Sequence, residues 1–449
     1  MVITDALAEY ISSALSKPLP TAVVLKAKHH VLDTVAAMLS GTRLLPGERA
    51  LAYAERLGGP PEAFVLGSGA SAGYLTAAFV NALLAHADET DDSHAPSLTH
   101  PGCSIVPAAL TTADWTRASG EDLIRAVVLG YDVCTRVNLA ITVPVLERTQ
   151  RSTYSISGAF GAMAAAAALT RLGFDSVRYA LSYTAQQASG LASWRRDLEH
   201  VEKAFVFAGM PVRAGTSAVD MVLNGFTGVA DVFDGPTNFM GAFSPEGAPG
   251  ELTRGLGTDH EIMRTNIKRW PVGSPIQAAV DSLTALMAEH DLSPERIERL
   301  TVRLPTGGAE TVDDRHMPDI NLQHIMAVTL LDGGLAFTAS QDYARMAAPD
   351  VVELKKRIRL IGDASLDNTD PPRQGIVEID LEDGTNLRHH TRAVRGTYDN
   401  PMPEDEVVKK AEDLLVPLLG EQRCAELVRA VLDLPNLDDV RRLRPLLTL

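Results

Sequence analysis

The sequence predicts a mostly α-helical protein with a large all-helical domain and a smaller α+β lid domain. Apolar residues recur at helical spacing through most of the chain before Arg269. Period-two alternation, which is typical of strands, occurs at Arg299–Pro305 and again at Gly375–Gly384. Helical spacing returns after Glu404. These observations predict a discontinuous helical domain over residues 1–268 and 396–449, and an α+β lid domain over residues 269–395.

The helical part divides into segments with recognisable ends. Thr4 or Asp5 is placed to cap a first helix, and Thr21 to cap a second that ends near Gly41. The helix over Ala72–Ala87 is apolar at nearly every position, which predicts burial on all sides. The predicted helices after Gly41 cover Ala72–Ala87, Glu121–Leu139, Ser155–Leu172 and about Pro211–Asn224.

The remaining part mixes helices and strands. The Asp383-Gly384 pair is a hairpin turn signal, so a return strand is expected to follow it. We expect helices over about Pro275–His290, Leu322–Leu331 and Val351–Ile358, a return strand over Leu387–Val394, and two final helices, Glu404–Leu419 and Glu421–Leu432.

Composition limits the class of protein. A chain of 449 residues with 45% hydrophobic and 22% charged residues is ordinary globular material. Chains longer than ~300 residues usually need more than one core, which agrees with two domains. The formal net charge of −16 argues against a nucleic-acid partner, because an acidic surface repels phosphates.

Cysteine usage and the chain start indicate the compartment. Three scattered cysteines without a CxxC pair exclude the common zinc and iron–sulfur spacings and suit a reducing compartment. The start, MVITDALAEY, has no basic stretch of the kind that opens a secretory signal. The longest uncharged small-apolar run, Gly158–Leu169, is shorter than the ~20 residues that span a bilayer. We therefore expect a cytoplasmic protein with no membrane partner.

The segment from Asn81 to Gly102 carries the most chemical information. An apolar helix leads into four carboxylates and two imidazoles, and a second apolar helix follows. Solvated loops also carry charge runs, but a segment between two buried helices favours half-buried groups with tunable pKa values. A metal site is the rival interpretation, although the spacing matches no known ligand motif. The polar residues are Asp88, Glu89, Asp91, Asp92, His94 and His100.

This segment resembles the MmgE/PrpD family, which includes dehydratases, decarboxylases and epimerases of small carboxylic acids. The family pattern is an Asn-led helix, then His-Ala-x-Asp-x-Asp-Asp-Thr-His, then His-Pro. Glu89 stands where the family usually has its first Asp. Further similarities lie at Ser157–Ala162, at Lys203–Gly215 (the family's Lys-x-Leu-His-x-Gly segment), at Ile267–Pro271, at Asp281 and at Leu331–Gly333. The pattern matches Asn81, His86, Ala87, Asp91, Asp92, Ser93, His94, His100 and Pro101.

The resemblance implies a homodimer whose active site lies between a helical domain and a lid and works without metal or organic cofactor. It implies that His100 is an active-site histidine and that Lys203 lies at, or one place from, the active-site lysine. Two further family histidines are absent. Ser152, Thr153 or Tyr154 occupies the neighbourhood of one, Gln277 replaces the other, and His324 stands where decarboxylases have a lid tyrosine.

We predict a catalytic group made of His100, a carboxylate from Asp91 or Asp92, Lys203, and Tyr154 or His324 as the second proton-transfer group. Each of these residues also has an ordinary structural interpretation, as a cap, a core residue or a surface charge. Guanidinium groups pair bidentately with carboxylates, which favours arginines as substrate ligands. The predicted substrate-binding residues are Arg151, Ser152, Lys268, Arg269 and Gln277.

The expected function is a cofactor-independent lyase of the dehydratase type that acts on a small di- or tricarboxylate. A base removes the proton next to a carboxylate, and an acid protonates the leaving hydroxyl or the carbanion. An epimerase or isomerase is the first alternative, because it begins with the same proton abstraction. The absent family histidines motivate a second alternative, a binding protein that has lost catalysis.

Overall fold

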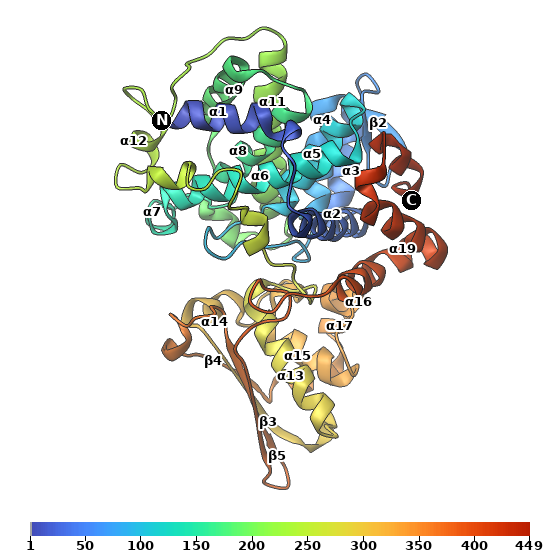
Figure 1. Cartoon of the computed structure of the whole chain (residues 1–449). Helices are drawn as coiled ribbons and strands as arrows, with labels where there is room; N and C mark the ends of the chain where they lie inside the picture. The colour runs from blue at the N-terminus through green and yellow to red at the C-terminus, as the bar shows by residue number, and fades with distance from the viewer. Residues whose placement is uncertain (1) are drawn as a thin grey trace. The chain divides into compact units, whose positions relative to one another are not determined.

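The computed structural model describes residues 2–449, which form two compact units. The first unit contains the chain up to Ala87, then Asp91–Thr265 and Val407–Leu449, and the second contains Asp88–Thr90 and Asn266–Glu406. Within the described residues, the first unit is helical apart from a short hairpin, and the second combines helices with a four-stranded sheet (Figure 1). The predicted mostly helical fold with an α+β part is confirmed, and the predicted domain boundaries stay a prediction.

Helix α8 (Ser155–Leu169) is the centre of the first unit, and all of its residues are buried. It packs against α5 (Gly102–Thr116), α6 (Gly120–Ile141) and α11 (Met210–Leu223). A helix that meets no water needs no polar stripe, which explains the run of small apolar residues in its sequence.

Glycine allows these helices to approach closely. A Cβ atom on Gly161 of α8 would lie 2.3 Å from Cδ1 of Ile105 and 2.7 Å from the carbonyl oxygen of Gly130 in α6. A Cβ atom on Gly215 of α11 would lie 2.5 Å from the carbonyl oxygen of Ala159. The central layer therefore depends on residues without side chains at its crossings.

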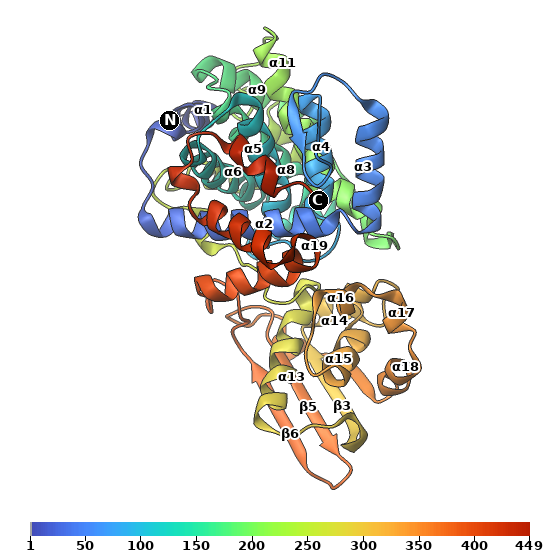
Figure 2. The same ribbon diagram turned by 90° about the vertical axis from the view of Figure 1, so that its right-hand side faces the viewer.

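The other elements of the first unit pack around this layer. Helix α4 packs on α5, and α3 lies beside α4 (Figure 2). The hairpin strands β1 (Ala63–Val65) and β2 (Ala70–Ala72) pair antiparallel. None of the helices described within residues 2–449 has both the length and the hydropathy needed to cross a membrane. The remaining helices are α1 (Ile3–Ser13), α2 (Thr21–Gly41), α3 (Leu45–Leu57), α4 (Tyr74–Ala85), α7 (Val143–Arg148), α9 (Phe174–Gln187), α10 (Val201–Ala204) and α12 (Phe239–Phe243).

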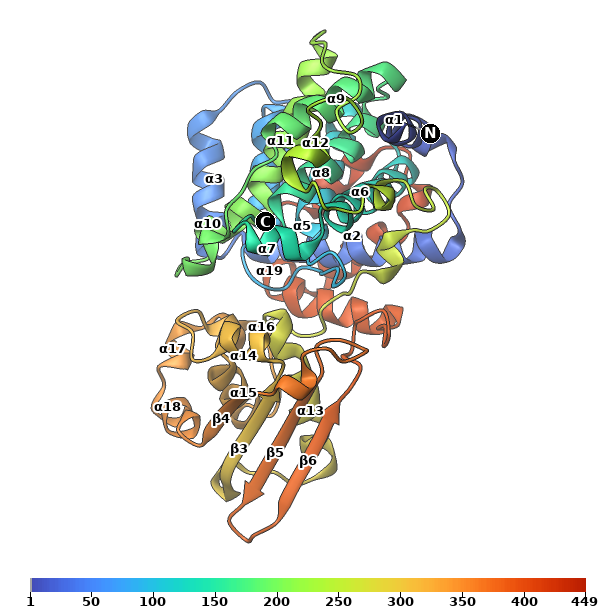
Figure 3. The same ribbon diagram turned by 90° about the vertical axis from the view of Figure 1, so that its left-hand side faces the viewer.

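The second unit is built on a sheet with strand order β4-β3-β5-β6 (Figure 3). Strand β3 pairs parallel with β4 and antiparallel with β5, and β5 and β6 form a hairpin. Helices α13 and α15 pack with the sheet around a core that includes Leu283, Val302, Ile325 and Val377. The elements are α13 (Gln277–Glu289), β3 (Ile297–Leu304), α14 (Thr306–Val312), α15 (Leu322–Leu331), α16 (Phe337–Gln341), α17 (Tyr343–Met346), α18 (Pro349–Lys355), β4 (Ile358–Gly362), β5 (Gly375–Leu381) and β6 (Asn386–Thr391).

Three local predictions need correction. Helix α1 is not capped by Thr4 or Asp5, because the carboxylate of Asp234 accepts the N–H groups of Ile3 and Thr4 at 2.8 Å. The N-cap of α2 is Pro20, without a side-chain hydrogen bond, rather than Thr21. The helix predicted to reach Ile358 ends at Lys355, because Ile358 begins β4.

The last long element agrees with its prediction. Helix α19 (Glu404–Leu432) is two helices joined at Gly420, whose φ of 73° and ψ of 164° interrupt the helical backbone. The sequence predicts this break between Leu419 and Glu421, since glycine adopts positive φ at little cost.

We expect Gly161→Ala to destabilise the protein by about 1–3 kcal/mol, because the added methyl overlaps Ile105 and backbone atoms in a close-packed layer. Gly307→Ala is the matched control, since Gly307 also lies within a helix, α14, and a Cβ there meets nothing within 4 Å. Chemical denaturation of both variants measures the difference. Equal unfolding free energies would show that the central layer can separate to admit the methyl group.

Candidate active site

The carboxylate of Asp91 joins two histidines inside the first unit. Its Oδ2 accepts a hydrogen bond from Nδ1 of His86 at 2.9 Å, and both of its oxygens lie 3.1 Å from Nδ1 of His100. His86 follows the last residue of α4, and His100 lies just before α5. Because a carboxylate only accepts hydrogen bonds, Nδ1 of each ring carries a proton and donates it to Asp91.

Burial strengthens the electrostatic interactions of Asp91 with His86 and His100, because little water screens them. Asp91 and His86 have fully buried side chains, and the His100 side chain is 9% exposed. Burial lowers the pKa of His86 well below its usual range, although the neighbouring Asp91 acts in the opposite direction. His86 is therefore a neutral imidazole at physiological pH.

An aromatic group adjoins the Asp91–His100 pair. The ring of Tyr154 stacks on Phe207 with centroids 3.5 Å apart, and the ring of His100 meets Tyr154 edge to face at 5.3 Å. Trp194 meets the edge of Phe207 at 4.7 Å. We call Tyr154, Trp194 and Phe207 the aromatic wall.

Lys203 lies against this wall. Its Nζ is 5.2 Å from the ring centroid of Phe207 and 5.5 Å from that of Trp194, which is cation–π distance. The residue is only 8% exposed. The structure thus brings together four of the predicted catalytic residues: His100, Asp91, Lys203 and Tyr154.

An irregular helix places Lys203 and Phe207. Helix α10 continues into a π-helix at Phe205–Gly209 and then into α11. A π-helix accommodates one residue more than an α-helical turn, so it turns Lys203 by about 100° relative to α11. Lys203 is six residues before Gly209, whereas the family's Lys-x-Leu-His-x-Gly pattern has five. The extra residue explains why the family register fits Lys203 only within one place.

Asp92 has a different role from Asp91. Its Oδ2 accepts hydrogen bonds from Nδ1 of His30 at 2.6 Å and from the hydroxyl of Tyr131 at 2.5 Å. Its Oδ1 accepts the N–H of Gly102 at 2.8 Å, at the start of α5. Asp92 therefore caps α5 and ties the loop to α2 and α6, and Asp91 is the carboxylate that contacts His100.

Two other predicted residues of the first unit have structural contacts. Oγ of Ser152 accepts the N–H groups of Tyr154 and Ser155 at 3.2 and 3.4 Å, which starts α8. The guanidinium of Arg151 lies 4.6 Å above the ring of Phe243. These contacts do not direct either residue to the Asp91–His100 pair, and their substrate-binding roles stay predictions.

Three predicted residues lie together in the second unit. Nζ of Lys268 donates to the carbonyl oxygen of Glu89 at 2.7 Å and lies 3.4 Å from its carboxylate. The guanidinium of Arg269 lies 4.5 Å above the ring of Trp270. The amide of Gln277 donates to the carbonyl of Trp270 at 2.8 Å and accepts its N–H at 3.1 Å, so it holds the backbone at this point.

His324 is a buried residue of α15 in the second unit. Its Nε2 lies 3.1 Å from the carbonyl oxygen of Ala339, to which it donates as a neutral ring. Burial lowers the pKa of His324 to about 4. These contacts are those of a core histidine, and its catalytic role stays a prediction.

Two models of one protein family match most of the chain. Residues 5–251 match the model of the MmgE/PrpD N-terminal domain, and residues 270–434 match that of the MmgE/PrpD C-terminal domain. The chain belongs to the MmgE/PrpD family.

Relatives within this family align over almost the whole chain. Cis-aconitate decarboxylase of Aspergillus terreus is 22% identical, over 99% of this chain and 96% of that protein. A cis-aconitate decarboxylase-like protein, oryM, of Aspergillus oryzae is 23% identical over 99% and 97%. Cis-aconitate decarboxylase of Homo sapiens is 24% identical over 99% and 94%. The family match and these relatives support an enzyme of the MmgE/PrpD type. Identities of 22–24% do not specify its activity.

Sequence reasoning did not select three residues that this MmgE/PrpD protein places at the site. His86 belongs to the family pattern quoted above, but only the structure shows that it shares Asp91 with His100. Phe207 stacks on both His86 and Tyr154, with centroids 4.3 and 3.5 Å apart. The ring of His200 lies 5.1 Å from that of His86. A lone histidine and a phenylalanine in an apolar run give no local signal of function.

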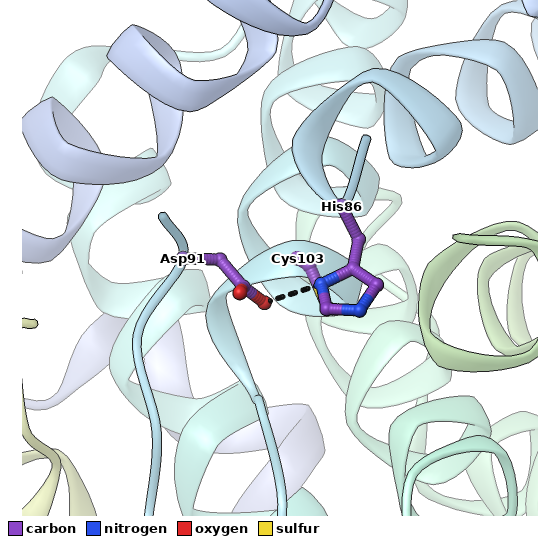
Figure 4. A group of neighbouring side chains, drawn as sticks. All are labelled: His86, Asp91 and Cys103. Atoms are coloured by element: carbon purple, nitrogen blue, oxygen red, sulfur yellow. Dashed lines mark hydrogen bonds and ion pairs between the residues drawn. The ribbon is translucent and has the colours of Figure 1, made fainter. Parts of the chain in front are cut away.

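Potential metal-ligand atoms of His86, Asp91 and Cys103 lie within 4.8 Å of one another (Figure 4). Nδ1 of His86 is already hydrogen-bonded to Asp91, and Sγ of Cys103 donates to the carbonyl of His100 at 3.1 Å. Burial raises the pKa of the Cys103 thiol well above its usual range, so the sulfur is not the thiolate that binds metals. The three residues fit a hydrogen-bonded network better than a metal centre.

We expect the enzyme to keep its activity after dialysis against a chelator. The physical reason is that Nδ1 of His86 already donates to Asp91 and the Cys103 thiol keeps its proton, so two of the three groups are not ready to bind a metal together. Elemental analysis and turnover before and after chelation provide the test. Stoichiometric zinc or iron, lost together with activity, would contradict this expectation.

Deletion of Ala208 should turn the π-helix into a continuous α-helix and rotate Lys203 and Phe207 together relative to α11, away from His86 and Tyr154. We expect kcat to fall by about 10²-fold, as is typical when a positioned group is displaced by an ångström or more. Helix content by circular dichroism and kcat should be measured on the same preparation. Deletion of Gly225, in the turn after α11, is the control for loss of one residue. An active, folded Ala208 deletion would show that the π-helix does not determine the position of Lys203.

Proposed function

We propose that this protein is a cofactor-independent acid–base enzyme, of the lyase type, acting on a small di- or tricarboxylate. The observation that carries the proposal is the Asp91–His100 pair beside Tyr154 and Lys203. The names of the relatives, cis-aconitate decarboxylases, support a lyase that acts on a carboxylic acid.

His100 is the base in this proposal. Asp91 accepts a hydrogen bond from Nδ1 of His100. In this proposal Nε2 is the nitrogen that removes the proton next to a substrate carboxylate. The proton moves from the α-carbon to Nε2, and Asp91 stabilises the imidazolium that forms.

Lys203 stabilises the carbanion. Loss of the α-proton turns a carboxylate into a dianionic enolate, which needs a cation beside it. The ammonium lies against aromatic rings and is almost excluded from water, so its field is screened less than at a surface. His100 thus transfers the proton and Lys203 stabilises the charge, so the proposed reaction requires no bound cofactor.

Tyr154 is the second proton-transfer group. Its ring lies against His100 and Phe207, at the start of α8. If its hydroxyl protonates a leaving group, the reaction is an elimination. If it returns a proton to the α-carbon, the reaction is an epimerisation, and the closeness of Tyr154, Lys203 and His100 favours this as the second candidate function. The homodimer and the cytoplasmic location stay predictions.

The proposal is tested by incubating the enzyme with a panel of carboxylates in deuterated water and following the α-proton by NMR. We expect one or more of these acids to exchange the α-proton. Exchange without loss of a group would indicate an epimerase, and an alkene signal would indicate a lyase. Absence of both across the panel would favour a binding protein without catalysis.

For the substrate found in this way, His100→Asn should reduce kcat by at least ~10²-fold, because a positioned base is lost. The melting temperature should not change, since Asp91 keeps its hydrogen bond from His86 and an asparagine amide can donate to it in place of Nδ1 of His100. His290→Asn, at an exposed position after α13, is the matched control. Unchanged kcat in His100→Asn would place the base elsewhere, and a large loss of melting temperature would make His100 a structural residue.

A further inference from the structure

Two buried histidines beside the Asp91–His100 pair have unsatisfied ring nitrogens. Nε2 of His86 and both ring nitrogens of His200 have no hydrogen-bond partner among residues 2–449. His86 is fully buried and His200 is 5% exposed. Their rings are 5.1 Å apart and tilted by 47°. Buried polar groups are nearly always paired, so unpaired nitrogens on adjacent rings indicate a place for a small polar group.

The backbone at His200 supports a functional role. Its φ of 62° and ψ of 4° lie in the left-handed region, which is unfavourable for a residue with a side chain. His200 is the N-cap residue of α10, but its side chain makes no capping hydrogen bond. Strained conformations of this kind are found preferentially at functional sites. The unfavourable backbone conformation of His200 is therefore not compensated by a capping hydrogen bond.

The two rings have complementary hydrogen-bonding capacity. His86 donates from Nδ1 to Asp91, so its Nε2 is an acceptor. His200 in the protonated form that an acid requires presents an N–H donor at each ring nitrogen. A hydroxyl group or a water molecule has both a proton to give and a lone pair to share, so it satisfies His86 and His200 together.

We propose that His86 and His200 bind the oxygen that leaves as water, or enters as water, in the lyase reaction. This inference rests on the proposed function and specifies it: the substrate is a hydroxy acid with its hydroxyl on the carbon next to the acidic C–H, or the matching unsaturated acid. In this elimination His200, rather than the Tyr154 hydroxyl considered above, is the acid for the leaving oxygen, and His86 accepts a hydrogen bond from it.

The chemical step balances as follows. Nε2 of His100 takes the α-proton, the C–H electron pair becomes the C=C bond, and the C–O bond breaks. The oxygen keeps the C–O electron pair and takes a proton from the imidazolium of His200, which becomes a neutral imidazole, so water leaves. His100 has gained one proton and His200 has lost one, and exchange with solvent restores both. Hydration is the reverse sequence.

The experiment compares two rates in the same variants: α-proton exchange in deuterated water, and incorporation of ¹⁸O from labelled water into the hydroxy acid. His200→Asn is the main variant, because asparagine tolerates the left-handed conformation. His86→Asn is the second, because its amide N–H can replace Nδ1 toward Asp91 while Nε2 is removed. His290→Asn is the control for a histidine lost from an exposed position.

In the wild type we expect ¹⁸O incorporation. In His200→Asn and His86→Asn it should fall by at least ~10²-fold, and by about tenfold more than α-proton exchange. His100→Asn should lower both rates together. His290→Asn should change neither rate.

Three results would overturn the inference. One is α-proton exchange by the wild type without ¹⁸O incorporation, which would leave the proposed acid–base function intact. Another is wild-type ¹⁸O incorporation in His200→Asn and His86→Asn, both folded by circular dichroism. The third is the absence of any exchange by the wild type, which would remove the proposed function and this inference together.

Discussion

The site depends on the burial of two adjacent carboxylates, Asp91 and Asp92, between two apolar helices. Both side chains are fully buried. A buried carboxylate is costly unless it is paired or hydrogen-bonded, so each fixes the positions of its partners. Asp92 holds His30, Tyr131 and the first N–H of α5, and Asp91 holds His86 and His100. Asp92 anchors the loop, and Asp91 contacts the two histidines of the candidate site.

This division of roles explains how the loop is held in place among the helices around it. His30 belongs to α2 and Tyr131 to α6, so Asp92 is held from two elements as well as from α5. His94, further along the loop, is fully buried and lies 3.2 Å from the carboxylate of Glu261. Burial alone would raise the pKa of Glu261, but hydrogen bonds from His94 and Arg264 lower it to about 2. The part of the loop that follows Asp91 is thus held by the hydrogen bonds of Asp92 and by the contact between His94 and Glu261.

Local sequence signals predicted the elements whose form is decided locally. Leu322–Leu331 and the break at Gly420 follow from periodicity and from glycine's backbone freedom. The cap of α1 could not be predicted, because Asp234 is more than two hundred residues away along the chain. The π-helix at Phe205–Gly209 was equally inaccessible, since nothing in an apolar run distinguishes one extra residue from a shifted α-helix.

The candidate site was predictable in its residue types but not in its assignments. His100, Asp91, Lys203 and Tyr154 do gather in one place, because a family pattern and acid–base chemistry both select them. Asp91 and Asp92 could not be separated, since neighbouring residues differ only in the side of the chain they occupy. His200 carried no signal, because its importance lies in a left-handed backbone and in its distance from His86.

The extra residue before Gly209 also changes the chemistry of the wall. Counted back from Gly209, Phe207 stands where the family pattern has histidine. An imidazole there would offer another hydrogen-bonding group beside His86, whereas the phenyl ring stacks on His86 and Tyr154 and fixes both. The same ring shields Lys203 from water and strengthens its attraction for a developing carbanion. The hydrogen-bonding groups next to Phe207 are therefore Tyr154 on one side of its ring and the His86–His200 pair on the other.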